Sequence, residues 1–191
     1  GVPGEFTRIN AKRKDYTIDP PKNCLDLLYK NNLDVIGLGK IGDLFNHKSL
    51  TTSVKTSNNL DGLMKLIDFT KSKFNGLLFI NLNDFDSLYG HRRDKEGYYK
   101  ALEDLDNYLP IFLNLLNKDD LIMITADHGN DPTFPGTDHT REYVPMLVFS
   151  KTFAEAGSLP QGHFADISAT IAENFGVPAT ENGESFLNLL K

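Results

Sequence analysis

Four short apolar runs constrain the fold of this chain more than any other feature of its sequence. They cover residues 34–39, 76–83, 121–126 and 144–150. Each run is short for a helix and is apolar without alternation, which is typical of strands that are buried on both faces. Helices are predicted between and around these runs, at residues 23–31, 58–74, 95–117 and 166–175. Strands interspersed with helices predict an α/β fold, with a mostly parallel sheet and helices on both of its faces.

The composition narrows the class of protein. The 191 residues are 40% hydrophobic and 24% charged, and their net charge of −6 argues against broad nucleic-acid binding. No apolar run has the length needed to cross a bilayer, and the basic N-terminal stretch lacks the apolar part of a signal peptide. We therefore expect a cytoplasmic protein without membrane or nucleic-acid partners. The single cysteine, Cys24, precludes an internal disulfide and is predicted to be a small core residue.

Polar residues gather directly after two of the predicted strands. The strand at 76–83 is followed by DFDSLYGHRRD at 84–94, and the strand at 121–126 by DHGNDPTFPGTDHTREY at 127–143. These two stretches contain three of the five histidines of the chain. In open α/β sheets, ligands bind beyond the carboxyl ends of the strands, so this is where a functional site is expected.

The residue types in these stretches suit a metal centre. Carboxylate oxygens and imidazole nitrogens together are typical ligands of Mn²⁺, Zn²⁺ or Fe²⁺. The candidate ligands are Asp86, His91, Asp127, His128 and His139. A two-metal centre needs about six protein ligands, so one is lacking, and the sequence shows no obvious activated nucleophile. The alternative for an Asp–His pair on a loop is a solvated surface or a local hydrogen bond. His47 and His163 are expected to be surface or capping residues.

Three segments carry a family resemblance. DFDSLYGHRRD, TADHGNDP and PGTDHTREYVP resemble signature segments of phosphopentomutases, which belong to the alkaline phosphatase superfamily of metalloenzymes. The resemblance extends from about residue 6 to the end of the chain. The DHG element is shared with cofactor-independent phosphoglycerate mutases, whereas GHRRD combined with GTDHTREYVP is more specific.

The resemblance implies a centre with two Mn²⁺ ions. Asp86, His91 and His139 match the ligands of one ion, and Asp127 and His128 match two ligands of the other. The remaining aspartate ligand and the phosphorylated threonine nucleophile of the family have no counterpart in this sequence.

The family also implies where a substrate would lie. Arg8 and Lys40 match positions that are expected to contact the sugar phosphate. Arg92, Arg93 and Arg141 lie beside the candidate ligands in the sequence, and each either contacts phosphate or balances nearby carboxylates.

The resemblance further predicts an alkaline-phosphatase-like core that lacks its N-terminal strand or strands and most of the cap domain. Residues 1–15 would be the exit from this cap, or a linker, and residues 16–191 the C-terminal part of the metal-binding catalytic core. The implied partner is the missing N-terminal half of the same enzyme.

The implied activity is phosphoryl transfer on a small phosphorylated pentose. Through a phosphothreonine and a bisphosphate intermediate, the enzyme would interconvert the 1-phosphate and 5-phosphate of ribose or deoxyribose. The alternatives are a cofactor-independent phosphoglycerate mutase or a phosphatase of the same superfamily. A third alternative is an inert metal-binding fragment, because we expect the chain to be inactive alone.

Overall fold

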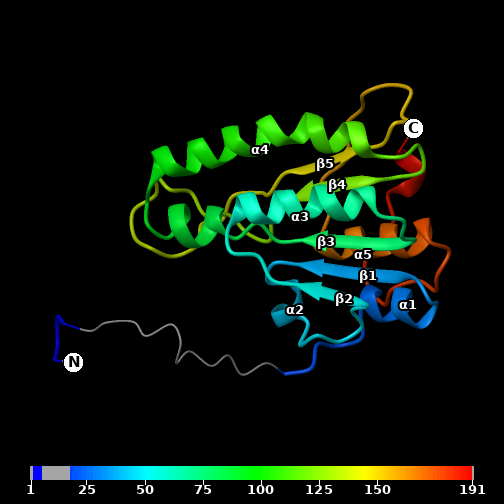
Figure 1. The fold of residues 1–191 in the computed structure, drawn as a ribbon, viewed down its shortest axis with the longest axis horizontal. Helices are drawn as coiled ribbons and strands as arrows, with labels where there is room; N and C mark the ends of the chain where they lie inside the picture. The colour runs from blue at the N-terminus through cyan, green and yellow to red at the C-terminus, as the bar shows by residue number, and fades with distance from the viewer. Residues whose placement is uncertain (1, 6–17, 191) are drawn as a thin grey trace.

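The computed structural model describes residues 2–5 and 18–190, which form an α/β fold (Figure 1). The predicted fold class is confirmed, because a parallel sheet lies between helices. The five α-helices of the described residues are α1 (Cys24–Lys30), α2 (Ile41–Leu44), α3 (Asn59–Lys71), α4 (Lys95–Leu115) and α5 (Phe164–Asn174). A π-helical segment, η2 (Phe85–Gly90), and a 3₁₀ turn, η3 (Leu187–Leu189), complete the helical elements.

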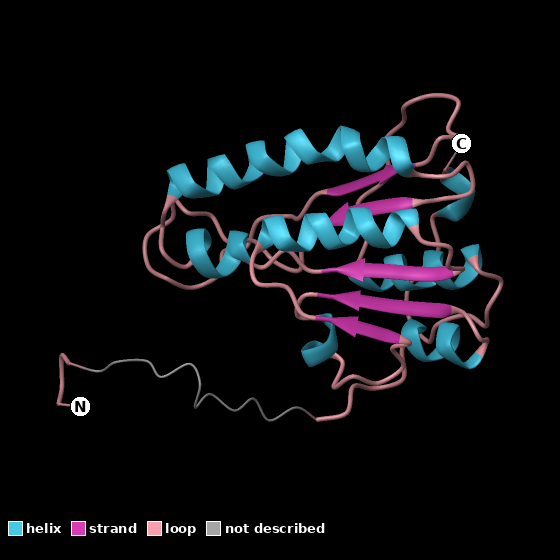
Figure 2. Cartoon of the chain, viewed as in Figure 1, coloured by secondary structure: helices cyan, strands magenta, loops and turns pink. Residues whose placement is uncertain are grey.

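The parallel sheet has three strands in the order β2–β1–β3. They are β2 (Thr52–Val54), β1 (Asp34–Leu38) and β3 (Gly76–Ile80). Ile36 in the central strand lies opposite Thr52 on one side and Leu78 on the other. Figure 2 shows the three arrows pointing the same way, so the carboxyl ends of all three strands lie at one edge of the sheet.

The two remaining strands form a separate antiparallel pair. They are β4 (Ile122–Thr125) and β5 (Met146–Phe149), with Ile122 opposite Phe149. Within the described part of the chain, no hydrogen-bonded ladder joins this pair to β3. The parallel sheet is therefore limited to β2, β1 and β3, and the other two strands pair antiparallel. The apolar runs alone did not reveal this difference.

The core of the molecule lies around β1. Val35 and Leu38 are completely buried, and Cys24 is buried in α1 as expected. The helix α1 packs against β1 and α5, whereas α3 crosses the opposite face of the sheet (Figure 1). Asn23 starts α1 by accepting a hydrogen bond from the amide of Leu25, which satisfies one of the free N–H groups of the first turn.

The sequence analysis missed the shortest elements, α2, β2, η2 and η3. They contain three to six residues each, too few to show a period. The predicted strand 76–83 ends earlier, at Ile80, and the helices agree with prediction to within a few residues. The predicted boundary near residue 15 lies outside the described residues. None of the described helices is both long and apolar enough to span a bilayer.

Candidate metal centre

The two stretches that the sequence analysis singled out lie at the same edge of the molecule. Residues 84–94 follow β3 and residues 127–143 follow β4, and both lie beyond the arrowheads of these strands (Figure 1). Each stretch has a local structure that fixes where its candidate ligands lie.

The first stretch contains the π-helical segment η2, which the sequence analysis did not predict. The amide of His91 donates to the carbonyl of Asp86 at 3.0 Å, and the amide of Asp94 donates to the carbonyl of Tyr89 at 3.0 Å. These hydrogen bonds span five residues, one more than in an α-helix. π-Helical segments are rare in proteins, but many of those that occur lie at functional sites. Because of this geometry, Asp86 and His91 both reach the same point although five positions separate them.

The second stretch is closed by a bridge between Gly129 and Thr140. The amide of Thr140 donates to the carbonyl of Gly129 at 3.0 Å. A Cβ atom at Gly129 would collide with the backbone of Thr140, so the bridge requires glycine here. The bridge brings together His128 and His139, whose rings stack with centroids 3.6 Å apart at an angle of 16°.

Three candidate ligand atoms converge where the two stretches meet. Asp86 Oδ1 lies 3.4 Å from His91 Nε2 and 3.2 Å from His139 Nε2. The two imidazole Nε2 atoms are 3.1 Å apart. The three atoms thus form a nearly equilateral triangle made of one carboxylate oxygen and two ring nitrogens.

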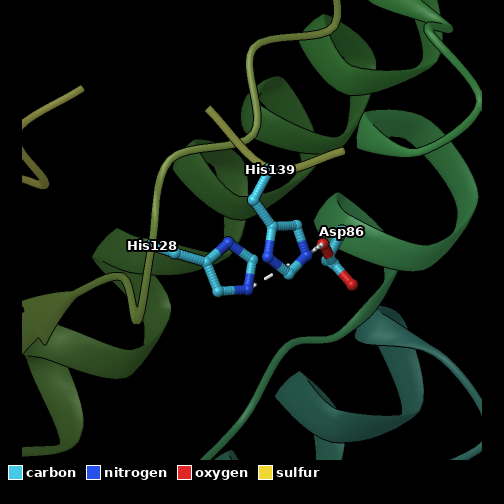
Figure 3. A group of neighbouring side chains, drawn as sticks. All are labelled: Asp86, His128 and His139. Atoms are coloured by element: carbon cyan, nitrogen blue, oxygen red, sulfur yellow. Dashed lines mark ion pairs between the residues drawn. The ribbon is translucent and has the colours of Figure 1, made fainter. Parts of the chain in front are cut away.

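The other two candidates lie beside this triangle. His128 Nε2 is 4.0 Å from Asp86 Oδ1 and 3.5 Å from Asp127 Oδ2. Asp86, His128 and His139 also form a group whose ligand atoms all lie within 4.8 Å of one another (Figure 3). Asp127 is the most exposed candidate, with 71% of its side chain accessible. The structure therefore brings all five candidates together, with Asp86 between the histidines.

The triangle has the dimensions of a metal site. Ligands at about 2.1 Å from a four- to six-coordinate ion lie about 3.0 to 3.4 Å from each other. The three distances among Asp86, His91 and His139 fall in this range. His91 Nδ1 lies 2.6 Å from the carbonyl of Thr137, so a proton on Nδ1 is donated there and the Nε2 lone pair is free for an ion.

The sequence analysis missed Asn130. This residue is buried, and its Nδ2 donates to Asp86 Oδ1 at 2.8 Å. Its amide lies directly against Gly90, where a Cβ atom would collide with it. The position of Asn130 next to the DHG element was the only signal in the sequence, and its contact with Asp86 across 44 residues could not be predicted from it.

The charge of Asp86 also acts on an aromatic neighbour. Burial, and then the negative charge of Asp86, raises the pKa of Tyr98. Asp131, on the second stretch, has a lowered pKa because the hydroxyl and amide of Thr133 donate to its carboxylate. Asp84 instead accepts a hydrogen bond from the amide of Asn59 at 2.7 Å and so supports the start of α3.

The arginines near the site differ in their surroundings. Arg93 donates only to backbone carbonyls and to an amide oxygen, so it is not positioned as a free phosphate contact. Arg92 and Arg141 are exposed and have no hydrogen bond or ion pair with other described residues. Arg8 lies outside the described residues.

Lys40 lines a small cavity of about 130 Å³ at the carboxyl end of the parallel sheet. Lys55 lines the same cavity, together with the start of α3 and with Asn83 and Asp84, which directly precede η2. The carboxylates of Asp43 and Asp84 also line the cavity, and Lys55 Nζ lies 3.6 Å from Asp43 Oδ1.

Comparison with known proteins agrees with this geometry. Residues 33–179 match the metalloenzyme superfamily. The chain belongs to this superfamily. Its fold is similar to a crystal structure of Leishmania mexicana phosphoglycerate mutase at low cobalt concentration, with a TM-score of 0.64 and 20% identity. The match covers 84% of this chain but only 38% of that mutase, so the metalloenzyme chain spans well under half of its length.

Proposed function

We propose that this metalloenzyme chain is the C-terminal, metal-binding part of a phosphopentomutase. The observation that carries the proposal is the convergence of Asp86, His91 and His139 within 3.1 to 3.4 Å of one another. Membership in the metalloenzyme superfamily supports metal use. The segments GHRRD and GTDHTREYVP support the pentose phosphate as substrate, because they are the part of the sequence specific to that family.

Two Mn²⁺ ions are the proposed cofactors. Asp86, His91 and His139 would hold one ion, and Asp127 and His128 would supply two ligands to the other. When bound, two such ions stabilise the charge on the phosphoryl oxygens during in-line transfer.

The residues of this chain orient the ligands and line the cavity beside them. The hydrogen bond from His91 Nδ1 to Thr137 keeps the other ring nitrogen directed at Asp86. Among the described residues that line the neighbouring cavity, Lys55 forms an ion pair with Asp43, whereas Lys40 has no ion-pair partner and is the proposed phosphate contact. Arg8 remains a proposed phosphate contact on the grounds of family resemblance.

The proposed activity needs residues from outside this sequence. The sixth ligand and a nucleophilic threonine would come from the preceding half of the enzyme. Thr125 does not fill this role, because it is exposed and its hydroxyl contacts only the carbonyl of Ala126, at 3.4 Å. We therefore predict that the 191-residue chain binds metal but does not turn over substrate. Mutase activity of this chain alone would contradict the prediction.

A phosphoglycerate mutase is the second candidate. The fold likeness to the Leishmania mexicana enzyme favours it, although 20% identity does not carry a substrate from one protein to another. The two candidates differ in the sugar or glycerate they accept, so a substrate comparison separates them.

The deciding assay uses the chain joined to its preceding half and supplied with Mn²⁺. Ribose 5-phosphate and 2-deoxyribose 5-phosphate should be converted to the 1-phosphates, and 3-phosphoglycerate should remain unchanged. Asp86→Asn should lower turnover about a hundredfold or more. Asp138→Asn, which changes an exposed carboxylate on the second stretch, should stay within a fewfold of wild type. Conversion of phosphoglycerate but not of pentose phosphates would establish the second candidate instead.

Calorimetric titration of the chain with Mn²⁺ tests the ligand assignment. We expect one well-occupied site, which His139→Ala abolishes and His128→Ala retains. Loss of the site in both variants would favour the grouping of Asp86, His128 and His139. Absence of binding to the wild-type chain would mean that the ligands are not organised without the preceding half.

A further inference from the structure

The side chain of Arg93 joins the two stretches that form the candidate metal centre. Arg93 belongs to the first stretch, but most of its acceptors lie on the second. The guanidinium donates to the carbonyls of Gly90, Asp131, Gly136 and Asp138 and to Oδ1 of Asn130. It is therefore the most extensively bonded side chain at this site.

Two of these carbonyls belong to residues that directly precede candidate ligands. Arg93 Nη1 lies 3.1 Å from the carbonyl of Gly90, the residue before His91. Arg93 Nη2 lies 2.6 Å from the carbonyl of Asp138, the residue before His139. A single planar group thus holds the backbone at both histidines, although the two are 48 positions apart.

A third connection runs to the carboxylate. Arg93 Nη1 donates to Asn130 Oδ1 at 2.9 Å, and Asn130 Nδ2 donates to Asp86 Oδ1 at 2.8 Å. The amide of Asn130 is fixed in this orientation, because its oxygen must face the guanidinium and its nitrogen the carboxylate. Arg93 therefore acts on Asp86 through one intervening side chain.

The chemistry of these contacts requires arginine. Nη1 has two hydrogens and three acceptors within 3.1 Å, so one hydrogen is shared. Lysine carries its donors on one nitrogen and cannot reach acceptors on both sides of a planar fork. Arg93 also has a φ of 56°, a backbone conformation that residues other than glycine rarely adopt.

We propose that Arg93 is a positioning residue, whose guanidinium sets the spacing of Asp86, His91 and His139 before a metal ion binds. This rests on the proposed metal centre, and it assigns to Arg93 a role other than phosphate contact or charge balance. Groups that orient metal ligands from outside the coordination sphere affect metal affinity by about 10- to 100-fold.

The test compares Arg93→Lys with Arg92→Lys in the 191-residue chain, using Co²⁺ as the probe. Both substitutions retain the positive charge, but only the Arg93 side chain donates hydrogen bonds to the second stretch, residues 127–143. We expect Arg93→Lys to weaken Co²⁺ binding about 10- to 100-fold and to change the visible absorption of the bound ion. Arg92→Lys should leave the affinity within about twofold of wild type and the spectrum unchanged. A purely structural role would lower the melting temperature in Arg93→Lys without altering affinity or spectrum, and that result would overturn the proposal.

A second measurement works without metal. Long-range ¹H–¹⁵N spectra of the imidazole rings report the protonation of each ring nitrogen in the metal-free chain. We expect His91 to show a single Nδ1-protonated form in wild type and an average of both forms in Arg93→Lys. If wild type failed to bind Co²⁺ but showed this difference, the proposed metal centre would fail in this chain while the positioning role of Arg93 would stand. Identical ring spectra in wild type and Arg93→Lys would refute the positioning role.

Discussion

The regions around α1 and around α4 differ sharply in how they are packed. The helix α1 has seven residues, of which Cys24, Leu25, Leu27 and Leu28 are buried. The helix α4 has 21 residues and none of them is buried. The same contrast holds for strands, because β1 is buried along nearly its whole length, whereas β4 and β5 contain no fully buried residue.

Both helices carry an apolar stripe, so the difference lies in what covers it. The face of α1 packs against β1 and α5. On α4, Leu102 and Ile111 remain about half exposed. The chain is therefore expected to draw its stability mainly from the α1 region. The candidate ligands lie on the other side of the molecule, where hydrogen bonds such as those of Arg93 take the place of a core.

The largest expected effect comes from truncating a side chain in the better packed region. Leu28 is completely buried, and Leu28→Ala should lower the free energy of unfolding by about 2–5 kcal/mol because it leaves a cavity. Leu102→Ala on α4 should cost less than about 1 kcal/mol, since half of that side chain is already in water. Urea denaturation of both variants measures this. Equal losses would show that the two regions contribute alike.

Metal binding should stabilise the candidate metal centre more than the region around α1. If the centre binds Mn²⁺ only in the folded state, an ion concentration of 100 times Kd should raise the free energy of unfolding by about 2.7 kcal/mol. Hydrogen exchange should slow most in η2 and at residues 129–140, and least in α1. Uniform slowing would mean that the ion acts on global unfolding alone.

Sequence patterns predicted the longer elements well, because a helical period or an apolar run can be recognised only when it extends over more than a few residues. The same patterns did not show that β4 and β5 pair antiparallel, since strand direction depends on the connection and not on the strand's own residues. At the site, the candidate ligands could be identified because their chemistry is unusual. Asn130 was missed, and Arg93 was expected only to contact phosphate or to balance carboxylates, because the contacts of both residues span 37 to 45 positions.

A smaller effect is expected from a buried hydroxyl in the α5 region. Thr170 is completely buried; its hydroxyl donates to the carbonyl of Asp166 and accepts from the amide of Phe186 at 3.0 Å. Thr170→Val keeps the shape but leaves this amide unpaired, which should cost about 1–3 kcal/mol. Thr70→Val is the matched control, because the Thr70 hydroxyl only donates within its own helix. Equal costs in thermal unfolding would mean that the Phe186 hydrogen bond adds nothing.

The smallest expected effect concerns pH, again in the better packed region. The amides of Glu184 and His163 donate to the carboxylate of Asp166, and these hydrogen bonds lower its pKa. A carboxylate whose pKa is lower in the folded than in the unfolded state stabilises the protein above the unfolded value of about 3.9. This stabilisation is lost as the pH falls through the folded pKa. Asp166→Asn should thus be less stable than wild type at pH 7, and the difference should shrink as the pH falls through the folded pKa of Asp166.

The control for this substitution is Asp106→Asn, an exposed position on α4 that changes the net charge equally. Its effect on the melting temperature should be small and should not follow the titration of a single group with a lowered pKa. Melting temperatures of wild type and both variants between about pH 2 and pH 7 provide the measurement. If both variants followed the same pH dependence, net charge rather than the hydrogen bonds to Asp166 would be the cause. A difference only in Asp166→Asn would place this acid-sensitive contribution in the region around α5 and leave α4, which has no buried residue, without a measurable share.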